Sequence, residues 1–294
     1  MGGTSLPIDR KYTATLLGFD GLVENSIDAT SSRDFAAEYV CNIAILMTNI
    51  SRIAEDFIIW SSSEFSFVEF SDKFASPSSV MPQKKNPDIM ELTRGKAALV
   101  IGESAGIMST IKGLPTGYGR DLQEIKPKVW SSSTTAIGAL AILEASLSSI
   151  KINEKNMKKA TKGGGYMVAL DIAEQLVLDG VPFREAHKIT ANLVQKAYNN
   201  KTILNELDLK SIDGMIGKSN IKASYIQSIL KTTTASASLR KRKSIGSAGF
   251  AEQKRMITKR KKHTARLYNK LTKHENHLAK TMKQMSTRIS KVMK

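Results

Sequence analysis

The chain has 294 residues, of which 41% are hydrophobic, and a formal net charge of +17 at pH 7. This length suffices for one large domain or two ordinary ones with a buried core, and the composition is that of a globular protein rather than a membrane protein. The apolar run from Ala136 to Leu143 stops at Glu144, well short of the roughly 20 residues of a membrane-spanning helix. The first residues lack a basic segment followed by an apolar one, so we expect no secretory signal and a cytoplasmic location.

The positive charge is concentrated at the C-terminal end. Residues 240–294 contain 18 Lys and Arg against Glu252 and Glu275, a balance of +16. Because the whole chain carries +17, residues 1–239 carry only +1. A solvated helix or a disordered tail accounts for such a block, and weak contact with nucleic acid or another polyanion is the functional alternative. Beyond residue 258 only Tyr268 is available for base stacking, which favours the solvated tail.

Long helical patterns fill the first half of the chain. Residues 33–61 repeat apolar side chains at three- and four-residue steps without a proline, which predicts a long, largely buried helix. A second helix is predicted from about 88 to 111, and a third from about 121 to 150, where Pro127 kinks or delays the first turns. Asn153 is expected to cap a short helix that follows.

These patterns predict an all-α fold, since the helices are long and no alternating strand pattern is bounded by hairpin turns. After the glycines at 163–165 the helical patterns become shorter. We therefore expect an incomplete central helical bundle over residues 1–160, a small helical C-terminal domain over residues 161–250, and a basic helical or disordered tail over residues 251–294.

A polar stretch, SSVMPQKKNPD at residues 78–88, lies between two of these helices and is interrupted by prolines. Proline disfavours regular helix and strand, so we expect an irregular loop. Ser78 beside an ammonium group is a candidate proton acceptor. Lys84 and Asn86 are candidates for stabilising the charge that develops on a carboxylate when an adjacent C–H bond breaks. The alternative is a solvated basic surface loop, which composition alone favours.

Two further polar clusters lie at the starts of predicted helices. Residues 113–126, GLPTGYGRDLQEIK, offer the hydrogen-bond donors Tyr118, Arg120, Gln123 and Lys126. This segment has no spacing that matches a phosphate-binding loop or a metal site. Residues 24–35, ENSIDATSSRDF, place Arg33 ahead of the first long helix, where a guanidinium can bind a carboxylate through two hydrogen bonds. Taken singly, each cluster is also explained as an ordinary helix start.

Taken together, the clusters resemble one known family. The stretch SSVMPQKKNPD is similar to the signature loop of the fumarase/aspartase superfamily, G-S-S-x-M-P-x-K-x-N, although Pro77 replaces the glycine. The segments NSIDATSSRDF, AEDFIIWSSSEFSFVE, ELTRGKAALVIG and GLPTGYGRDLQEIK occur in the family's order and narrow the resemblance to argininosuccinate lyase over about residues 4–250. The resemblance implies a long-helix bundle of the fumarase/aspartase type followed by a small helical domain.

The resemblance also implies an activity, the β-elimination of argininosuccinate to arginine and fumarate in arginine biosynthesis, without a metal or an organic cofactor. Ser78 matches the base that removes the Cβ proton, and Lys84 and Asn86 match the residues that stabilise the carbanion. Glu91 matches the carboxylate that pairs with the family's catalytic histidine. The residues that match the substrate-binding set are Arg33, Ser79, Tyr118, Gln123 and Lys126. The family forms homotetramers in which each active site draws on several subunits.

The resemblance starts at a point where a family subunit is already deep in its sequence. The family's first domain, the opening of its bundle and its catalytic histidine belong to the part before that point. None of the histidines of this chain matches the position of the family's catalytic histidine. They are His187, His263, His274 and His277. We therefore expect Glu91 to lack its histidine within residues 1–294, and this chain alone to have little lyase activity. The alternative is a non-catalytic helical assembly or binding protein that retains the lyase scaffold.

Overall fold

The computed structural model describes residues 2–77, 80–81, 85–162, 165–216 and 221–293. Within these ranges the elements are helices, apart from four strands of two residues each. Contacts between residues divide the chain into two compact units, one of residues 1–156 with 275–294 and the other of residues 157–274. The described part contains no helix with the length and apolar character needed to cross a membrane.

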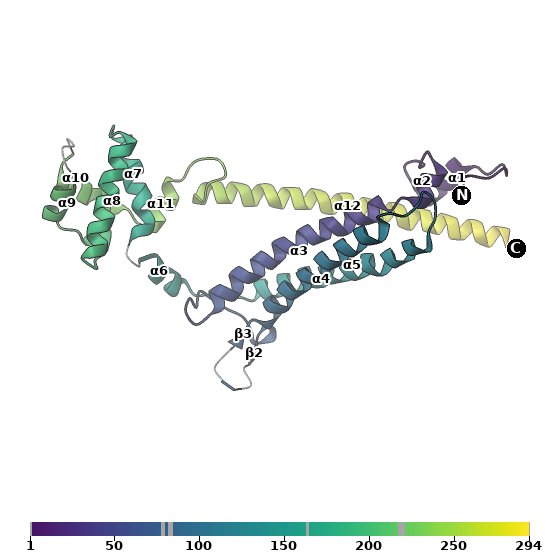
Figure 1. Ribbon diagram of the computed structural model, residues 1–294, viewed down its shortest axis with the longest axis horizontal. Helices are drawn as coiled ribbons and strands as arrows, with labels where there is room; N and C mark the ends of the chain where they lie inside the picture. Colours follow the sequence, from purple (N-terminus) through teal and green to yellow (C-terminus); the bar gives the residue numbers. More distant parts are fainter. Residues whose placement is uncertain (1, 78–79, 82–84, 163–164, 217–220, 294) are drawn as a thin grey trace. The chain divides into compact units, whose positions relative to one another are not determined.

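Three long helices form the centre of the first unit (Figure 1). They are α3 (Asp34–Ser61), α4 (Asp88–Ile111) and α5 (Ile125–Ser148). The three predicted helices are thereby confirmed, and so is the all-α fold class. Shorter elements of this unit are α1 (Arg10–Leu17), α2 (Ser26–Ser31), η1 (Asp72–Phe74) and η2 (Arg120–Glu124), with α6 (Glu154–Lys162) at its boundary.

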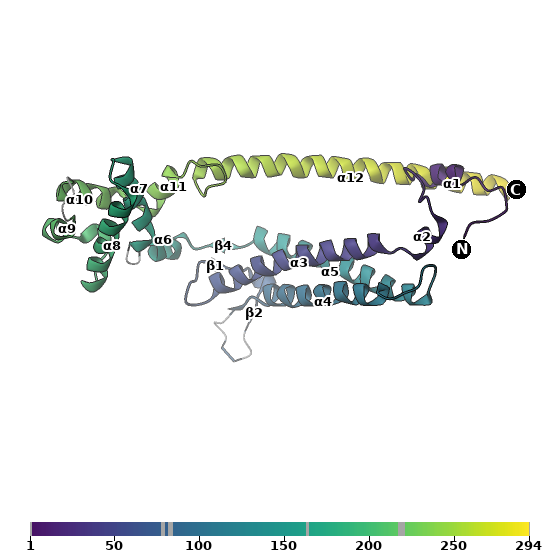
Figure 2. The ribbon, with the colours of Figure 1, turned by 45° about the horizontal axis from the view of Figure 1, so that its top comes forward.

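Helices α3 and α4 pack antiparallel, and α5 packs against both (Figure 2). At one end of the bundle, the buried Met90 of α4 packs in a cluster with Ala54 of α3 and Leu143 of α5. At the other end, Ile107 of α4 packs with Val40 of α3. The start of α4 therefore lies beside the end of α3, and the end of α4 beside the start of α3.

Local sequence signals explain where two helices begin. Pro127 lies in the first turn of α5, just after η2, where the backbone N–H that proline lacks has no intrahelical partner. The predicted delay of this helix is thus taken up by η2. Asn153 accepts a hydrogen bond from the backbone N–H of Asn156 through Oδ1 at 3.3 Å, which confirms its role as the cap of α6.

Two antiparallel strand pairs close the loops at one end of the bundle. Strands β1 (Val68–Glu69) and β4 (Lys151–Ile152) pair with Glu69 opposite Lys151. Strands β2 (Ser76–Pro77) and β3 (Lys85–Asn86) pair with Ser76 opposite Asn86 and Pro77 opposite Lys85. The second pair brings together the two ends of the polar loop that the sequence singled out.

The second unit has its own apolar core. Its helices are α7 (Ala169–Leu178), α8 (Phe183–Asn199), α9 (Leu209–Ile216), α10 (Ala223–Thr232) and α11 (Ala235–Lys241), with η3 (Tyr166–Val168) and η4 (Leu204–Glu206). Leu176, Leu193 and Ile226 are fully buried in this core. The carboxylate of Asp171 is also buried, and it accepts hydrogen bonds from Ser238 Oγ at 2.7 Å and Arg242 at 3.3 Å.

The basic C-terminal segment forms one helix, α12 (Phe250–Val292). Its residues up to 274 belong to the second unit and those from 275 to the first. In the first unit, Arg288 of α12 donates a hydrogen bond to Tyr12 of α1 and lies over its ring at 5.7 Å. Gly18 ends α1 in the left-handed region at φ 74°, and a Cβ there would lie 2.8 Å from the ring of His277. A side chain at position 18 would therefore push α1 away from α12.

The core of the second unit allows a direct test of its packing. Replacing Leu193 by Ala should lower the free energy of unfolding by about 2–5 kcal/mol, because the fully buried side chain leaves a cavity. Leu178→Ala is the matched control, since this leucine is 80% exposed and its loss should change stability by less than about 0.5 kcal/mol. Urea unfolding followed by circular dichroism measures both; equal losses would contradict the assigned core.

Candidate active site

Asn86 and Glu91 lie at the start of α4. Asn86 ends strand β3, is half-buried and lines a cavity of about 50 Å³ with Ser61, Val68, Phe70 and Ala75 among its neighbours. Pro87 separates β3 from the helix, and Glu91 lies in the first helical turn with an exposed side chain. Ser78, Ser79 and Lys84 lie outside the described residues. Of the predicted catalytic residues, the structure describes Asn86 and Glu91, which lie five residues apart across the start of α4.

The buried face of α4 fixes this start of the helix. Met90, in the first turn of α4, is fully buried, whereas its neighbour Glu91 is exposed. Asp88 begins α4, and its Oδ2 atom is buried without a hydrogen-bond partner in the described part of the chain. A buried carboxylate oxygen is costly to leave unpaired, so this atom is an open acceptor beside the two candidate residues.

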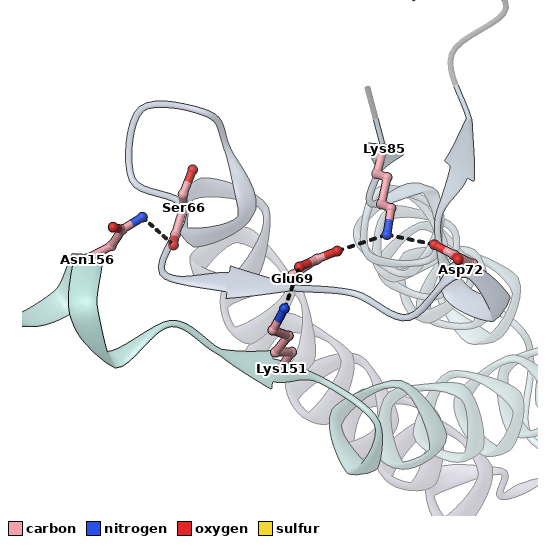
Figure 3. A network of polar contacts seen from close by, with 6 residues as sticks. All are labelled: Ser66, Glu69, Asp72, Lys85, Lys151 and Asn156. Atoms are coloured by element: carbon pink, nitrogen blue, oxygen red, sulfur yellow. Dashed lines mark hydrogen bonds and ion pairs between the residues drawn. The ribbon is translucent and has the colours of Figure 1, made fainter. Parts of the chain in front are cut away.

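An ion network supports the end of the polar loop from the outside (Figure 3). The Lys85 ammonium lies 2.9 Å from Glu69 Oε1 and 2.7 Å from Asp72 Oδ1. The other oxygen of Glu69 lies 3.5 Å from the Lys151 ammonium. The network therefore joins β3 to β1, to η1 and, through Lys151, to β4.

These contacts shift the pKa values of both partners in the direction that keeps them charged. The hydrogen bonds to Asp72 and Glu69 raise the pKa of Lys85 to about 12. The hydrogen bond and charge of Lys85, with a smaller effect of Lys151, lower the pKa of Glu69. Lys85 is thus a fixed cation at neutral pH.

The substrate-binding candidates that the structure describes form a second group. Gln123 Nε2 donates a hydrogen bond to the Tyr118 hydroxyl at 2.7 Å, and both side chains are exposed. Lys126 follows in the first turn of α5 and is also exposed. Arg33 precedes α3, where its guanidinium donates to the carbonyls of Thr30 and Ser32 at 3.0 and 2.6 Å. These donors surround the end of the bundle where Leu122 and Ile125 pack against the start of α3.

The two groups lie at opposite ends of the same bundle. Asn86 and Glu91 are at the start of α4, whereas Tyr118 and Gln123 follow its end. The 24 residues of α4 separate the groups by about 36 Å. Among the candidates that the structure describes, Asn86 and Glu91 therefore lie far from Tyr118, Gln123 and Lys126 within one chain.

Over the described ranges, no group of three or more His, Cys, Asp and Glu side chains is arranged to hold an ion. Amide, hydroxyl, guanidinium and ammonium donors are present at both bundle ends, and so are carboxylates, such as Asp88 and Glu91 at one end and Asp121 and Glu124 at the other. Such donors suit the binding of an anionic substrate.

Sequence reasoning missed Lys85, Glu69 and Asp72. Lys85 stands between Lys84 and Asn86, which match the family's signature, whereas Lys85 matches no residue to which a role was assigned. Glu69 and Asp72 are 13 or more residues away along the chain, and no local pattern connects them to Lys85. Only the strand pairing brings these charges together.

Comparison with known proteins covers both units. Residues 1–102 match a family model described as Lyase, and residues 166–236 match one described as Argininosuccinate lyase C-terminal. The argininosuccinate lyase of Nitrosopumilus maritimus is 51% identical over 293 residues, which are 100% of this chain and 60% of that protein. That of Lactococcus lactis subsp. cremoris (strain MG1363) is 40% identical over 89% of this chain and 56% of its own length.

Solved structures agree with these matches. An EDDS lyase in complex with formate has a TM-score of 0.83 and 26% identity, over 99% of this chain and 58% of its own. A class II fumarase from Schistosoma mansoni, at 16% identity and a TM-score of 0.59 over 71% of this chain and 40% of its own, shares the fold. The chain is thus an all-helical protein of the fumarase-type lyase class. Within this class, it belongs to the argininosuccinate lyase family, and it spans 60% and 56% of the length of the two argininosuccinate lyases named above.

Proposed function

We propose that this chain acts in an argininosuccinate lyase that cleaves argininosuccinate to arginine and fumarate in arginine biosynthesis. The observation that supports the proposal is that Asn86 of the signature stretch ends β3 and Glu91 follows in the first turn of α4. A 51% identity to a protein named argininosuccinate lyase supports the substrate. The proposal includes a cytoplasmic location and needs neither a metal nor an organic cofactor.

In the proposed reaction, Ser78 takes the proton from Cβ of the succinyl group. The electron pair left on Cβ is delocalised onto the adjacent carboxylate, where Lys84 and Asn86 stabilise the added charge. The pair then forms the C=C bond of fumarate as the C–N bond breaks. The departing guanidino nitrogen takes up a proton, for which Glu91 with the family's histidine is the proposed source.

The separation of the two groups supports a site built from several copies of this chain. A catalytic group must lie within hydrogen-bond reach of its substrate, and about 36 Å of helix is far beyond that reach. The start of α4 from one subunit and the Tyr118–Lys126 segment from another would complete one site. Large exposed apolar side chains on the bundle support the homotetramer that this requires; they are Phe35, Ile45, Leu92, Leu99, Trp130 and Ile137.

Helix α12 supports a second, weak binding function for a polyanion. Between residues 253 and 274 there are nine Lys and Arg and no Asp or Glu. Lys259, Lys262 and Arg266 follow one face of the helix at three- and four-residue steps, and none forms an ion pair within the described residues. Like charges at these spacings repel, so an external anion would relieve the repulsion. We propose a phosphate polymer, nucleic acid, as that anion.

A coupled assay of fumarate formation tests the lyase proposal. The chain combined with the N-terminal segment of a related lyase should convert argininosuccinate to fumarate, and residues 1–294 alone should show little activity. Ser78→Ala in the combined enzyme should lower kcat by at least about 10³-fold while leaving assembly unchanged, because the proton acceptor is lost. An inactive combined enzyme would favour the non-catalytic scaffold instead.

Mixing two inactive variants tests the shared site. In the combined enzyme, Asn86→Ala and Gln123→Ala subunits, each nearly inactive, should regain partial fumarate formation when refolded together, because some sites then receive two intact groups. Asn86→Ala mixed with Glu91→Ala is the matched control, since both changes lie at the same end of the bundle. Recovery in the control mixture, or none in the first, would contradict a site assembled across subunits.

Salt dependence tests the polyanion proposal. The chain should bind a labelled 20-base-pair DNA duplex with an affinity that falls steeply between 50 and 200 mM salt. The triple variant Lys259→Gln, Lys262→Gln, Arg266→Gln should bind more weakly and reduce the salt slope by about 3. The control triple variant carries Lys188→Gln, Lys210→Gln and Lys231→Gln on the second unit. Equal effects of the two triple variants would show non-specific net charge rather than a binding face.

A further inference from the structure

Lys85 stands beside Asn86 at the end of the polar loop, yet its own side chain is directed to a different set of partners. Successive residues of a β-strand point to opposite faces, so the direction of Lys85 in β3 determines that of Asn86. We propose that Lys85, held by Glu69 and Asp72, is a positioning residue for the elimination reaction, because it fixes the orientation of Asn86. This inference rests on the proposed lyase function and adds a residue to it.

The backbone alone holds β3 weakly. The β2–β3 ladder has only two residue pairs, and a ladder this short is marginal by itself. Its second pair places Pro77 opposite Lys85, and Pro77 has no backbone N–H to donate. The side chain of Lys85 adds two attachments to this short ladder, because it bonds to Glu69 on β1 and to Asp72 on η1.

The partners of Lys85 are themselves anchored. Glu69 lies directly opposite Lys151 in the β1–β4 pair, and its second oxygen contacts the Lys151 ammonium. The Asn153 backbone N–H donates to the Phe67 carbonyl at 2.8 Å. Asn156 Nδ2 donates to the Ser66 carbonyl at 3.2 Å (Figure 3). Lys85 thus connects Asn86 to the segment that follows α5 and not only to its own loop.

The protonation state of Lys85 distinguishes a positioning role from a role as a catalytic acid or base. With a pKa raised to about 12 by its two carboxylate partners, Lys85 keeps its proton at neutral pH. Its hydrogen bonds are directed to Asp72 and Glu69. Its side chain is also 43% exposed, and exposed ion pairs stabilise a fold very little. Losing the charge should therefore disturb the geometry of β3 and not the folding of the unit.

The experiment compares Lys85→Met, which removes the charge at similar length, with Lys85→Arg, which retains a cation for both carboxylates. Lys73→Met is the matched control, because Lys73 lies in η1 beside Asp72 and is exposed. Each variant is measured in the combined enzyme for kcat and KM. Hydrogen exchange of the backbone amides over residues 85–91 and the thermal midpoint are measured on the same samples.

We expect Lys85→Met to lower kcat by about 10- to 100-fold with KM changed less than about threefold, since misplacing a group by about 1 Å has an effect of this size. Exchange over residues 85–91 should become faster while the thermal midpoint stays unchanged. Lys85→Arg should recover most of kcat, and Lys73→Met should match the unmodified enzyme.

Unchanged kcat and unchanged exchange in Lys85→Met would overturn the inference, and so would a kcat loss that follows a lowered thermal midpoint. If the unmodified combined enzyme were inactive, the lyase proposal itself would fail. The exchange comparison between Lys85→Met and Lys73→Met would still decide whether Lys85 fixes β3.

Discussion

The antiparallel packing of α3 on α4 is the constraint on which the rest of the first unit depends. Buried side chains such as Met47, Met90 and Val100 hold the two helices together along their length. This packing sets the distance between the start and the end of α4, and it fixes which polar segment lies at which end. The two described candidate groups therefore lie at opposite ends of α4, about 36 Å apart.

The distance between the two groups suggests a role for the exposed apolar faces of the bundle as contacts between subunits. Under the proposed shared site the chain needs neighbouring subunits, and the large exposed apolar side chains on α3, α4 and α5 are the surface that they would cover. Oδ2 of Asp88 at the start of α4 is buried and has no hydrogen-bond partner among the described residues, so a donor from a neighbouring subunit could satisfy it. Assembly and catalysis then depend on the same helices.

Support for the loop end comes from charges rather than from backbone pairing. The β2–β3 ladder is short and contains Pro77 in place of the family's glycine, so the ion pairs of Lys85 help to hold Asn86.

Among the described residues, the charges of the basic helix α12 are mostly not paired in this way. It carries many cations with few acidic partners, and its charge is therefore available to a ligand outside the chain.

Local signals in the sequence determined a large part of this protein. Three- and four-residue apolar steps predicted α3, and capping by Asn153 placed the start of α6, because both signals act within a few turns of chain. The motif order likewise indicated the family and the candidate residues. Only the tertiary structure decided that these residues form two distant groups, and that Lys85 meets Glu69 and Asp72. Those facts arise from the packing direction of helices and the pairing of strands, which join residues that the sequence leaves far apart.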